Sequence, residues 1–488
     1  MNSESILVTV LNKSGPIPNV AAILSHRPRK VLLIDGSGIC EDSDLNRNFE
    51  IIRHWSEGTL LDLYNFEVDT VLDPSCLPGF LDYKPEINRI CIEDIYQDST
   101  VIHEKIELMS SDSNISEICF EVNAGRKEDG VKLTRISTNE TFSINNSLWY
   151  TDVSTGNCID ISTGEIKQGV EKLSQIDKWW LLGKPVLNIS KVYHRRDHSN
   201  QLISQTLDSL VEAIRNANQN EDRFNLLEAS VISSGLNFGE SDIGIEITSN
   251  ITESFGKIEL PKFTLDSKNG LWLENVTSLA LMNGFEMETV HCGISLGHSD
   301  KNERMGSLKS FLRKGGGKEA IFKITEQSKS ILEEEKEIDM NIIMTSFSEE
   351  DYSGWLRIKE HESQINMLSE WVVDNWAKLS SNLRGELMRY CANRDLDVFA
   401  EGDIPIFIEC KLGLSKFGAK VARSQLDSII HSSGNRGTYY SFLIHNQVLN
   451  PHRSSTNQFI CNWTQLRDKE EMLEIEKSRI DFNPDKLG

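Results

Sequence analysis

The stretch RDLDVFAEGDIPIFIECKL, residues 394–412, predicts the local fold around it. It holds two short apolar runs, Leu396 to Ala400 and Pro405 to Lys411, joined by Glu401-Gly402-Asp403. A glycine-containing turn between two such runs is typical of a β-hairpin, because glycine lets the backbone reverse. The second run is almost entirely apolar, as in a strand that is covered on both faces of its sheet. We therefore expect a hairpin whose second strand is central and buried.

The hairpin carries three charged side chains that suit a metal site. Side chains alternate between the two faces of a strand, so Glu409 and Lys411 share one face and Cys410 takes the other. Pairing of the two strands can bring Asp397 to the same place. Divalent cations such as Mg²⁺ prefer oxygen ligands, and a bound metal activates water and stabilises charge on phosphate oxygens. The pattern favours a site that hydrolyses phosphodiesters, with an ordinary charged surface hairpin as the alternative.

The motif DLDVF followed by IFIECK resembles the nuclease motif of the PD-(D/E)XK superfamily. The resemblance is to the form found in CRISPR ancillary nucleases, which pair this motif with an N-terminal CRISPR-associated Rossmann-fold (CARF) sensor. Those relatives usually read close to ELDV and IECK, so Asp395 stands here in place of a glutamate and keeps its charge. The resemblance implies that Asp397, Glu409 and Lys411 are catalytic, with Mg²⁺ or Mn²⁺ as cofactor. Lys411 would orient the attacking water, and the backbone carbonyl of Cys410 would add a metal ligand.

A third carboxylate is expected at Glu274. The segment Gly270-Leu271-Trp272-Leu273-Glu274 resembles the G-x-W-L-E segment that opens the catalytic domain of those nucleases, where the glutamate helps to hold the metal. Asp374 and Glu386 lie closer to Asp397 in sequence and compete for this role, although Asp374 falls on the expected solvent-exposed flank of its helix. We favour Glu274 because its flanking residues match.

A long insertion precedes the hairpin. About a hundred residues separate it from METVHCGISLG, a predicted strand at residues 287–297, whereas the relatives make this connection short. The insertion, residues 301–389, contains a predicted helix with one apolar stripe, made of Ile365, Leu368, Val372, Trp376 and Leu379. Insertions of this size form lids, substrate gates or oligomer contacts, and the sequence does not choose among them.

The N-terminal region predicts a βαβ unit. ILVTVL at residues 6–11 and RKVLLID at 29–35 are typical of buried parallel strands, with a helix between them, and further strands are expected at 89–95 and 117–127. In an open α/β sheet, ligands bind beyond the carboxyl ends of the strands, near a switch point. The loops Asn12 to Asn19 and Asn123 to Lys127 are therefore the expected ligand loops, with plain connections as the alternative.

These two loops also carry a resemblance. The pattern S-G-P-I-P-N resembles the opening of CARF sensors, and NAGRK is similar to their Asn-x-x-Gly-x-x-Lys phosphate loop, although it is shortened and followed by EDGVKL rather than a clear helix. The resemblance implies a two-fold homodimer that binds a cyclic oligoadenylate, most often the tetra-adenylate in relatives of this architecture. The implied ligand-binding residues are Asn12, Ser14, Pro18, Asn19, Gly125 and Lys127.

The overall charge restricts how the protein can meet nucleic acid. A formal charge of −23 argues against nonspecific coating of nucleic acid, because Lys and Arg carry phosphate binding. Residues 411–453 are different, with six Lys or Arg and a single acid. This segment predicts a basic groove beside the hairpin. The expected nucleic-acid contacts are Lys420, Arg423, Gln425 and Arg436.

Composition and length predict a soluble cytoplasmic protein of about three domains. The chain has 488 residues, 39% of them hydrophobic, no apolar run as long as a membrane helix, and no basic region before the first apolar segment. Nine cysteines without a C-x-x-C pair suggest reduced thiols. We therefore expect neither export nor contact with a membrane.

The expected fold class is α/β, with a Rossmann-like sensor, a helical connector and a restriction-endonuclease-like domain that carries the insertion. The predicted boundaries are 1–163 for the sensor, 164–255 for the connector, 256–300 with 390–463 for the nuclease domain, 301–389 for the insertion and 464–488 for a charged tail. The connector contains a predicted apolar helix, Leu202 to Asn216, and the pair Trp179-Trp180, which we expect to pack there or at a dimer interface.

The functional hypothesis is a nuclease of type III CRISPR antiviral defence, activated by cyclic oligoadenylate and cleaving DNA or RNA. Two alternatives stay open. One is an ungated PD-(D/E)XK nuclease of the DNA repair or restriction type. The other is a catalytically inactive protein that binds the cyclic nucleotide.

Overall fold

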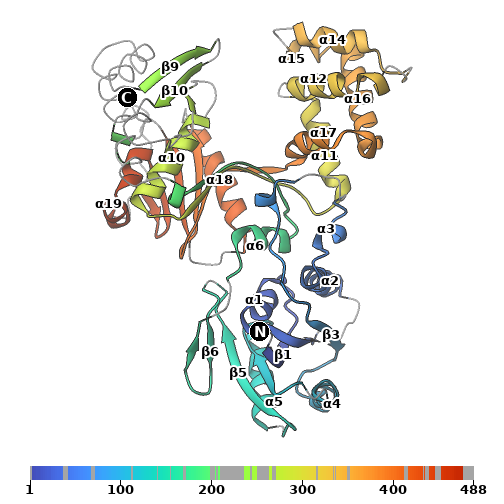
Figure 1. The fold of residues 1–488 in the computed structure, drawn as a ribbon, viewed down its shortest axis with the longest axis vertical. Coiled ribbons are helices and arrows are strands. Elements are labelled where there is room, and N and C mark those ends of the chain that lie inside the picture. Colours follow the sequence, from blue (N-terminus) through green and yellow to red (C-terminus); the bar gives the residue numbers. More distant parts are fainter. Residues whose placement is uncertain are drawn as a thin grey trace. The chain divides into compact units, whose positions relative to one another are not determined.

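The protein, described here as a computed structural model, has a mixed α/β fold (Figure 1). The structure describes residues 3–36, 42–66, 72–111, 114–139, 141–153, 155–168, 172–197, 204, 207–208, 236–241, 244–249, 263–265, 271–314, 317–332, 335, 337–348, 352–411, 416–431, 433–434, 439–445 and 452–475. The chain forms two compact units, Met1–Val186 with Gly297–Asn393, and Leu187–Leu296 with Arg394–Gly488. No helix within the described ranges is long and apolar enough to cross a bilayer.

The first unit contains a seven-stranded sheet among its described residues. Its order is β3 (Glu86–Cys91), β2 (Pro28–Asp35), β1 (Ser3–Val10), β4 (Glu117–Glu121), β5 (Asn145–Thr151), β6 (Cys158–Asp160) and β7 (Ile166–Lys167). The first five strands in this order are parallel, and β6 and β7 continue antiparallel. The chain runs outward from β1 to β3 and then returns to place β4 on the other side of β1. This reversal makes a switch point between β1 and β4.

The helices of this unit include one that the sequence analysis missed. They are α1 (Ile17–His26), α2 (Ser43–Glu57), α3 (Leu60–Leu63), α4 (Ser99–Ser110), α5 (Lys127–Asn139) and α6 (Gln175–Leu181). We expected no clear helix after NAGRK, and this was wrong, because α5 starts at Lys127. Gly130 lowers helix propensity, but it lies where α5 approaches β4, and a Cβ there would be 3.0 Å from the Val122 carbonyl oxygen.

Two further expectations for this region change. Trp179 and Trp180 are fully buried in α6 within the first unit, and the indole of Trp180 donates to the Cys76 carbonyl oxygen at 2.7 Å. The sequence of residues 148–162 predicts a hairpin at the edge of the sheet, and a hairpin is present as β5 and β6, with Thr151 opposite Cys158. It does not form the edge, because β5 also pairs with β4 and because β7 lies outside β6.

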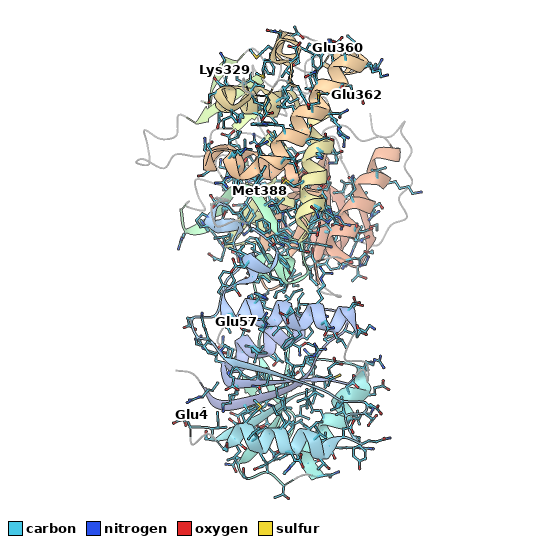
Figure 2. All side chains as sticks on the ribbon, turned by 90° about the vertical axis from the view of Figure 1, so that its right-hand side faces the viewer. Glu4, Glu57, Lys329, Glu360, Glu362 and Met388 are labelled. Atoms are coloured by element: carbon cyan, nitrogen blue, oxygen red, sulfur yellow. The ribbon has the colours of Figure 1, made fainter. Side chains whose placement is uncertain are left out.

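The segment between β12 and β13 is helical and belongs to the first compact unit. Its helices are α11 (Lys301–Leu312), α12 (Lys318–Gln327), α13 (Lys329–Leu332), α14 (Met340–Ser348), α15 (Tyr352–Trp355), α16 (Lys359–Asp374) and α17 (Ser381–Met388). The apolar stripe predicted on α16 is confirmed, since Ile365, Leu368 and Val372 are buried. Glu360 and Glu362, near the start of this helix, are exposed (Figure 2).

The second unit is built on another seven-stranded sheet among the described residues. Its order is β16 (His452–Ser455), β17 (Gln458–Cys461), β15 (Tyr440–His445), β14 (Ile406–Lys411), β13 (Arg394–Glu401), β12 (Thr289–Leu296) and β8 (Val186–His194). The predicted hairpin is confirmed as antiparallel β13 and β14. Strand β14 is central, because β15 pairs with it in parallel on its other side, and Ile406, Phe407 and Ile408 are buried.

Two long helices accompany this sheet. Helix α10 (Leu271–Gly284) shares a hydrophobic core with β12, β13 and β14, and α18 (Lys416–His431) connects β14 to β15. The sequence of residues 414–433 predicts a helix with Val421, Leu426 and Ile430 facing inward. Leu426 and Ile430 are buried, but Val421 is 39% exposed and Ala422 is buried in its place. The face of α18 that meets the sheet is therefore rotated by one residue at this point.

Several smaller elements complete the second unit. They are a separate sheet of β9 (Leu236–Ser241), β10 (Gly244–Ser249) and β11 (Phe263–Leu265), and the short helix α19 (Lys469–Glu474). Strand β8 was not predicted, because its residues fall in a connector that showed no clear strand pattern. The predicted helix Leu202 to Asn216 lies almost wholly outside the described residues.

Candidate active site

The site begins where the β13–β14 hairpin stops pairing. Main-chain pairing joins Val398–Ala400 to Ile406–Ile408. At the next position, the main-chain N–H of Cys410 donates to the Asp397 carboxylate, with 2.6 Å between the nitrogen and Oδ2. The Asp397 side chain thus accepts the hydrogen bond that a main-chain carbonyl would accept in a regular antiparallel pair of strands. This holds the Asp397 carboxylate in the opening between the two strands.

Glu409 and Lys411 meet Asp397 at this opening. The Lys411 ammonium donates to Glu409 Oε1 and lies 3.8 Å from Asp397 Oδ2. The Cys410 thiol points to the opposite face, 3.8 Å from the Thr277 hydroxyl of α10. In an extended strand, the N–H and C=O of one residue point to the same side. The Cys410 carbonyl therefore faces the same side as Asp397.

Glu274 joins the same group of charges from α10. It lies in the first turn of that helix, and its pKa is raised to about 8 by burial and by the charges of Asp397 and Glu409. The fold thus brings Glu274 and Asp397 together across more than a hundred residues of sequence. Gly270 and the side chains of Leu271 and Trp272 lie outside the described residues.

Gly293 of β12 shapes the space beside Glu274. It lies across from Asp397, between the pairs Cys292–Val398 and Ile294–Leu396. Its φ of 58° is in the left-handed region that favours glycine. A Cβ here would lie 3.8 Å from Glu274 Oε2 and 2.4 Å from the Ser190 hydroxyl, so a larger side chain would disturb the site.

The electrostatics of the site favour a bound cation. Burial and the Asp397 charge raise the pKa of Glu409 to about 7, and burial also raises the pKa of Asp397. Burial lowers the pKa of Lys411, but its acidic neighbours outweigh this effect, so the net shift is upward. Three carboxylates thus surround one ammonium group. Like charges in a partly desolvated site repel strongly, and a divalent cation would relieve that repulsion.

The donor set has the oxygen ligands that Mg²⁺ or Mn²⁺ prefers, but its side chains are not already arranged around a metal position in the described part of the chain. Glu409 Oε2 is buried and has no hydrogen-bond partner among the described residues. Lys411 occupies Glu409 Oε1. Metal binding through Oε1 would therefore require Lys411 to release Glu409.

The predicted nucleic-acid residues are spread around α18. Lys420 and Gln425 are exposed, but they are five residues apart and project from different sides of the helix. Arg423 is half-buried and donates to Gln458 Oε1 of β17 at 3.3 Å. Arg436 lies outside the described residues. Lys420 and Arg423 share one side of the helix, three residues apart.

The two predicted ligand loops lie side by side at the switch point, because β1 and β4 are parallel neighbours. Asn12 and Asn19 shape the first loop. The Asn19 amide donates to the Val10 carbonyl oxygen at 2.8 Å, and its own carbonyl accepts from the Asn12 N–H at 3.2 Å. Ser14 is exposed, its N–H bonded to Asn12 Oδ1 at 2.8 Å, and Pro18 lies in the first turn of α1.

The second loop supplies a glycine and a lysine. Gly125 has φ 85°, and a Cβ there would be 2.9 Å from Val10 Cγ1, so only glycine fits against β1. Lys127 is exposed at the start of α5. Asn19 is fully buried, so its role is to hold the loop rather than to touch a ligand. The exposed residues on these loops are Lys13, Ser14, Arg126 and Lys127.

The competing carboxylates have other surroundings. Glu386 forms an ion pair with Lys323 at 3.2 Å within the helical segment. Asp374 is the last residue of α16.

Sequence reasoning also missed residues that shape the site, namely Gly293 and its neighbour Ser190. A glycine inside a strand pattern signals a bulge or a close backbone approach, so Gly293 could have been found in HCGISL.

Comparisons with solved structures return distant likenesses. No protein-family model matches the sequence, and no curated protein matches it significantly. Can2 from Sulfobacillus thermosulfidooxidans in complex with cyclic tetra-adenylate is similar with TM-score 0.44 and 12% identity over 90% of this chain and 89% of that one. Protein VC1899 from Vibrio cholerae gives 0.47 and 10% over 96% of each chain. Enterococcus italicus Csm6 bound to cyclic hexa-2'-fluoro-hexa-dAMP gives 0.21 and 10% over 80% of this chain and 93% of that one. Scores this low do not assign a role to any residue.

Proposed function

We propose that the protein is a metal-dependent nuclease of type III CRISPR defence that is switched on by a cyclic oligoadenylate. The observation that carries the proposal is the meeting of Glu274, Asp397 and Glu409 around Lys411. These carboxylates come from a helix and two strands that are far apart in sequence. Burying three like charges in one place costs stability, so the arrangement calls for a function that uses it.

The chemistry proposed for this site is hydrolysis of a phosphodiester. Glu274, Asp397, Glu409 and the Cys410 carbonyl would hold Mg²⁺ or Mn²⁺, which supplies an activated water and charge stabilisation on the phosphate. Lys411, once released from Glu409, would orient the water that attacks phosphorus while the bond to the leaving oxygen breaks. Lys420 and Arg423 would contact neighbouring phosphates of DNA or RNA, with Gln425 and Arg436 as further contacts.

The sensing part of the proposal rests on the switch point of the first sheet. Its strand order, with β1 and β4 adjacent and two loops beyond them, supports a Rossmann-like nucleotide-binding domain. Lys127 at the start of α5 is well placed for a phosphate, because a helix N-terminus favours negative charge. The resemblance to CARF sensors makes a cyclic oligoadenylate the proposed ligand, with the tetra-adenylate first and a homodimer as the binding form.

Gating imposes a thermodynamic condition on this ligand. It can activate the nuclease only if it binds the active arrangement more tightly than the inactive one. A change from 1% to 99% active requires a preference of about 10⁴-fold. Contacts made in only one arrangement must supply that difference.

The test is a cleavage assay of the full chain in Mn²⁺, with and without cyclic tetra-adenylate and cyclic hexa-adenylate. Single-stranded and supercoiled substrates are compared, and a Glu409→Ala, Lys411→Ala double variant is the control. We expect cleavage only with ligand and only in the wild type. Cleavage without ligand would instead indicate an ungated nuclease. Cleavage that survives in the double variant would refute the proposed site, and ligand binding without cleavage would indicate a binding protein.

A further inference from the structure

Three neighbouring strands of the second sheet carry the chain between the two compact units. The chain changes unit at residues 186/187, 296/297 and 393/394. These positions are the start of β8, the end of β12 and the start of β13, which are adjacent in the sheet order. On the first unit's side, the Gly297 N–H donates to the Pro185 carbonyl oxygen at 2.9 Å, so two of these segments are already paired there.

The edge strand β8 makes two polar contacts with the elements that surround Glu274. The Tyr193 hydroxyl donates to Asn275 Oδ1 at 2.5 Å, and both residues are buried. Asn275 directly follows Glu274 in the first turn of α10. The Ser190 hydroxyl donates to the Gly293 carbonyl oxygen at 3.2 Å, on the backbone that faces the Glu274 carboxylate.

We propose that Tyr193 and Ser190 are positioning residues that fix Glu274 beside Asp397 and Glu409. This inference rests on the proposed function and deepens it. Tyr193 holds the helix that carries Glu274, and Ser190 holds the strand against which Glu274 lies. A catalytic group displaced by about 1 Å can lose on the order of 10² in rate, so loss of either contact is expected to slow cleavage.

The alternative is that Tyr193 only fills the core. Its ring belongs to the hydrophobic cluster of α10, β12, β13 and β14. Tyr193→Phe separates the two roles, because it keeps the ring and removes only the hydroxyl. Tyr64→Phe is the matched control, since the buried Tyr64 hydroxyl also donates one hydrogen bond, to the Trp180 carbonyl oxygen at 2.9 Å, in the first unit.

The experiment compares full-length wild type, Tyr193→Phe, Ser190→Ala and Tyr64→Phe. Mn²⁺ affinity is measured by calorimetry, cleavage is measured as kcat and KM with cyclic tetra-adenylate, and amide hydrogen exchange is followed over residues 271–284. For Tyr193→Phe we expect kcat to fall about 10- to 100-fold, with several-fold weaker Mn²⁺ binding, an unchanged KM and faster exchange in the first turns of α10. Ser190→Ala should show the same pattern more weakly, and Tyr64→Phe should leave all three measurements within about twofold.

The outcomes separate this inference from the proposed function. A wild type that neither binds Mn²⁺ nor cleaves would refute the nuclease, whereas the exchange measurement still tests the positioning of α10. Unchanged exchange over residues 271–284 in Tyr193→Phe would overturn the inference in either case. Unchanged kcat and Mn²⁺ affinity in that variant, with an active wild type, would overturn it as well.

Discussion

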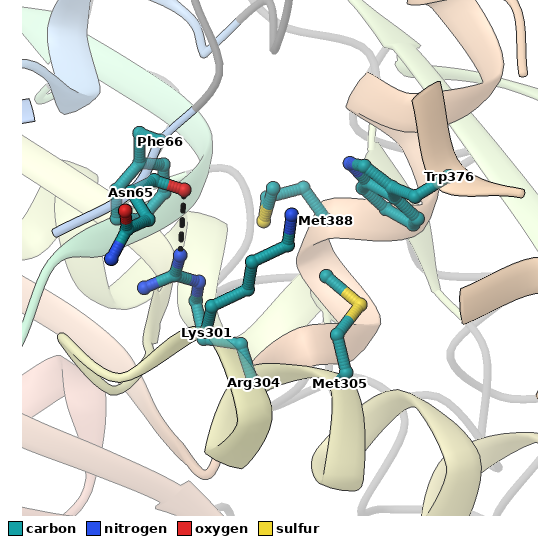
Figure 3. A pocket seen from close by; sticks show the side chains of 7 residues that line it. All are labelled: Asn65, Phe66, Lys301, Arg304, Met305, Trp376 and Met388. Atoms are coloured by element: carbon teal, nitrogen blue, oxygen red, sulfur yellow. Dashed lines mark hydrogen bonds between the residues drawn. The ribbon is translucent and has the colours of Figure 1, made fainter. Parts of the chain in front are cut away.

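Each unit buries charged side chains, and the groups that surround these charges differ. The first unit surrounds one arginine with main-chain carbonyl oxygens, whereas the second places three carboxyl groups beside one ammonium group. In the first unit, Arg304 of α11 is 1% exposed, and its guanidinium donates to the carbonyl oxygens of His298, Ser299, Tyr64 and Asn65 at 2.8 to 3.3 Å. It also lies over the Phe66 ring, 4.0 Å from the centroid. Figure 3 shows Arg304 with Phe66 and the hydrogen bond to the Asn65 carbonyl oxygen, in a small pocket that Lys301 and Trp376 also line. Backbone dipoles and an aromatic face thus stabilise the single charge.

In the second unit, the charges oppose one another. Glu274, Asp397 and Glu409 share one ammonium group, and the pKa of each carboxyl is raised. Arg304 joins the helical segment to the loop after α3, so its buried charge holds the fold together. The carboxylates instead hold electrostatic repulsion that a bound cation would relieve. The groups that contact a buried charge, and not its burial alone, therefore indicate whether its role is structural or functional.

The largest expected effect is on catalysis. Glu409→Gln removes one carboxylate charge without changing shape, and we expect cleavage to fall by about 10² to 10³-fold or more while the protein stays folded. Asp403→Asn, in the exposed turn of the same hairpin, is the control and should retain activity. The measurement is the ligand-activated, single-turnover cleavage rate in Mn²⁺. Equal rates for the two variants would mean that Glu409 has no part in the reaction.

Removal of the buried Arg304 charge should change the stability of the protein rather than the cleavage reaction. Arg304→Met leaves four main-chain carbonyls without their donor, and we expect a loss of about 3 kcal/mol in the free energy of unfolding. Arg53→Met is the matched control on α2, where Arg53 is paired with Glu50 and Glu57 at the surface and should contribute less than about 1 kcal/mol. Urea unfolding of the full chain measures both. A small effect at Arg304 would break the contrast between the two sites.

The sequence could predict the local parts of both units. Turn chemistry and the apolar run of IPIFIEC were sufficient for the β13–β14 hairpin, and the β-branched runs were sufficient for β1 and β2. Helix α5 was missed because Gly130 resembles a helix breaker until its contact with Val122 is known. Strand β8 was missed because an edge strand is defined by its partner, which is about a hundred residues away in sequence.

The candidate site also combines local features that the sequence predicts with long-range contacts that it does not predict. Alternation along β14 was sufficient to place Glu409 and Lys411 on one face, because that relation is local. The hydrogen bond from Cys410 to Asp397 and the approach of Glu274 depend on packing between distant elements, and no sequence spacing encodes them. Val421 shows this on a smaller scale, since a helical pattern predicts a stripe but not which neighbouring residue of α18 meets the sheet.

The dependence of stability on pH and on metal tests whether the carboxyl groups of the second unit repel one another. The folded-state pKa of Glu274 and Glu409 is raised to about 8 and about 7, above the ordinary value of 4.5. Between pH 4.5 and pH 8 the folded protein therefore binds more protons than the unfolded chain, so stability without metal falls as pH rises. We expect this loss to be on the order of a few kcal/mol and to be reversed by saturating Mn²⁺. Thermal unfolding at several pH values, in EDTA and in Mn²⁺, measures it, and a site that gains nothing from Mn²⁺ at pH 8 would not be a metal site.

The smallest expected change in stability comes from one substitution at Glu274, and its sign distinguishes a functional charge from a structural one. Glu274→Gln removes one of the opposing charges, so without metal it should stabilise the protein by about 1 kcal/mol at pH 8 and by almost nothing at pH 4.5, where the carboxyl of the wild type is protonated. The same variant should lose cleavage and gain less stability from Mn²⁺, because it lacks a ligand. Glu370→Gln, on the exposed side of α16, should change stability by less than about 0.5 kcal/mol at either pH. Only a site that maintains charge repulsion for its function should give a variant that is more stable and less active. The cluster of Glu274, Asp397 and Glu409 is such a site. Destabilisation by Glu274→Gln at pH 8 would instead place Glu274 with Arg304, among the charges that hold the fold together.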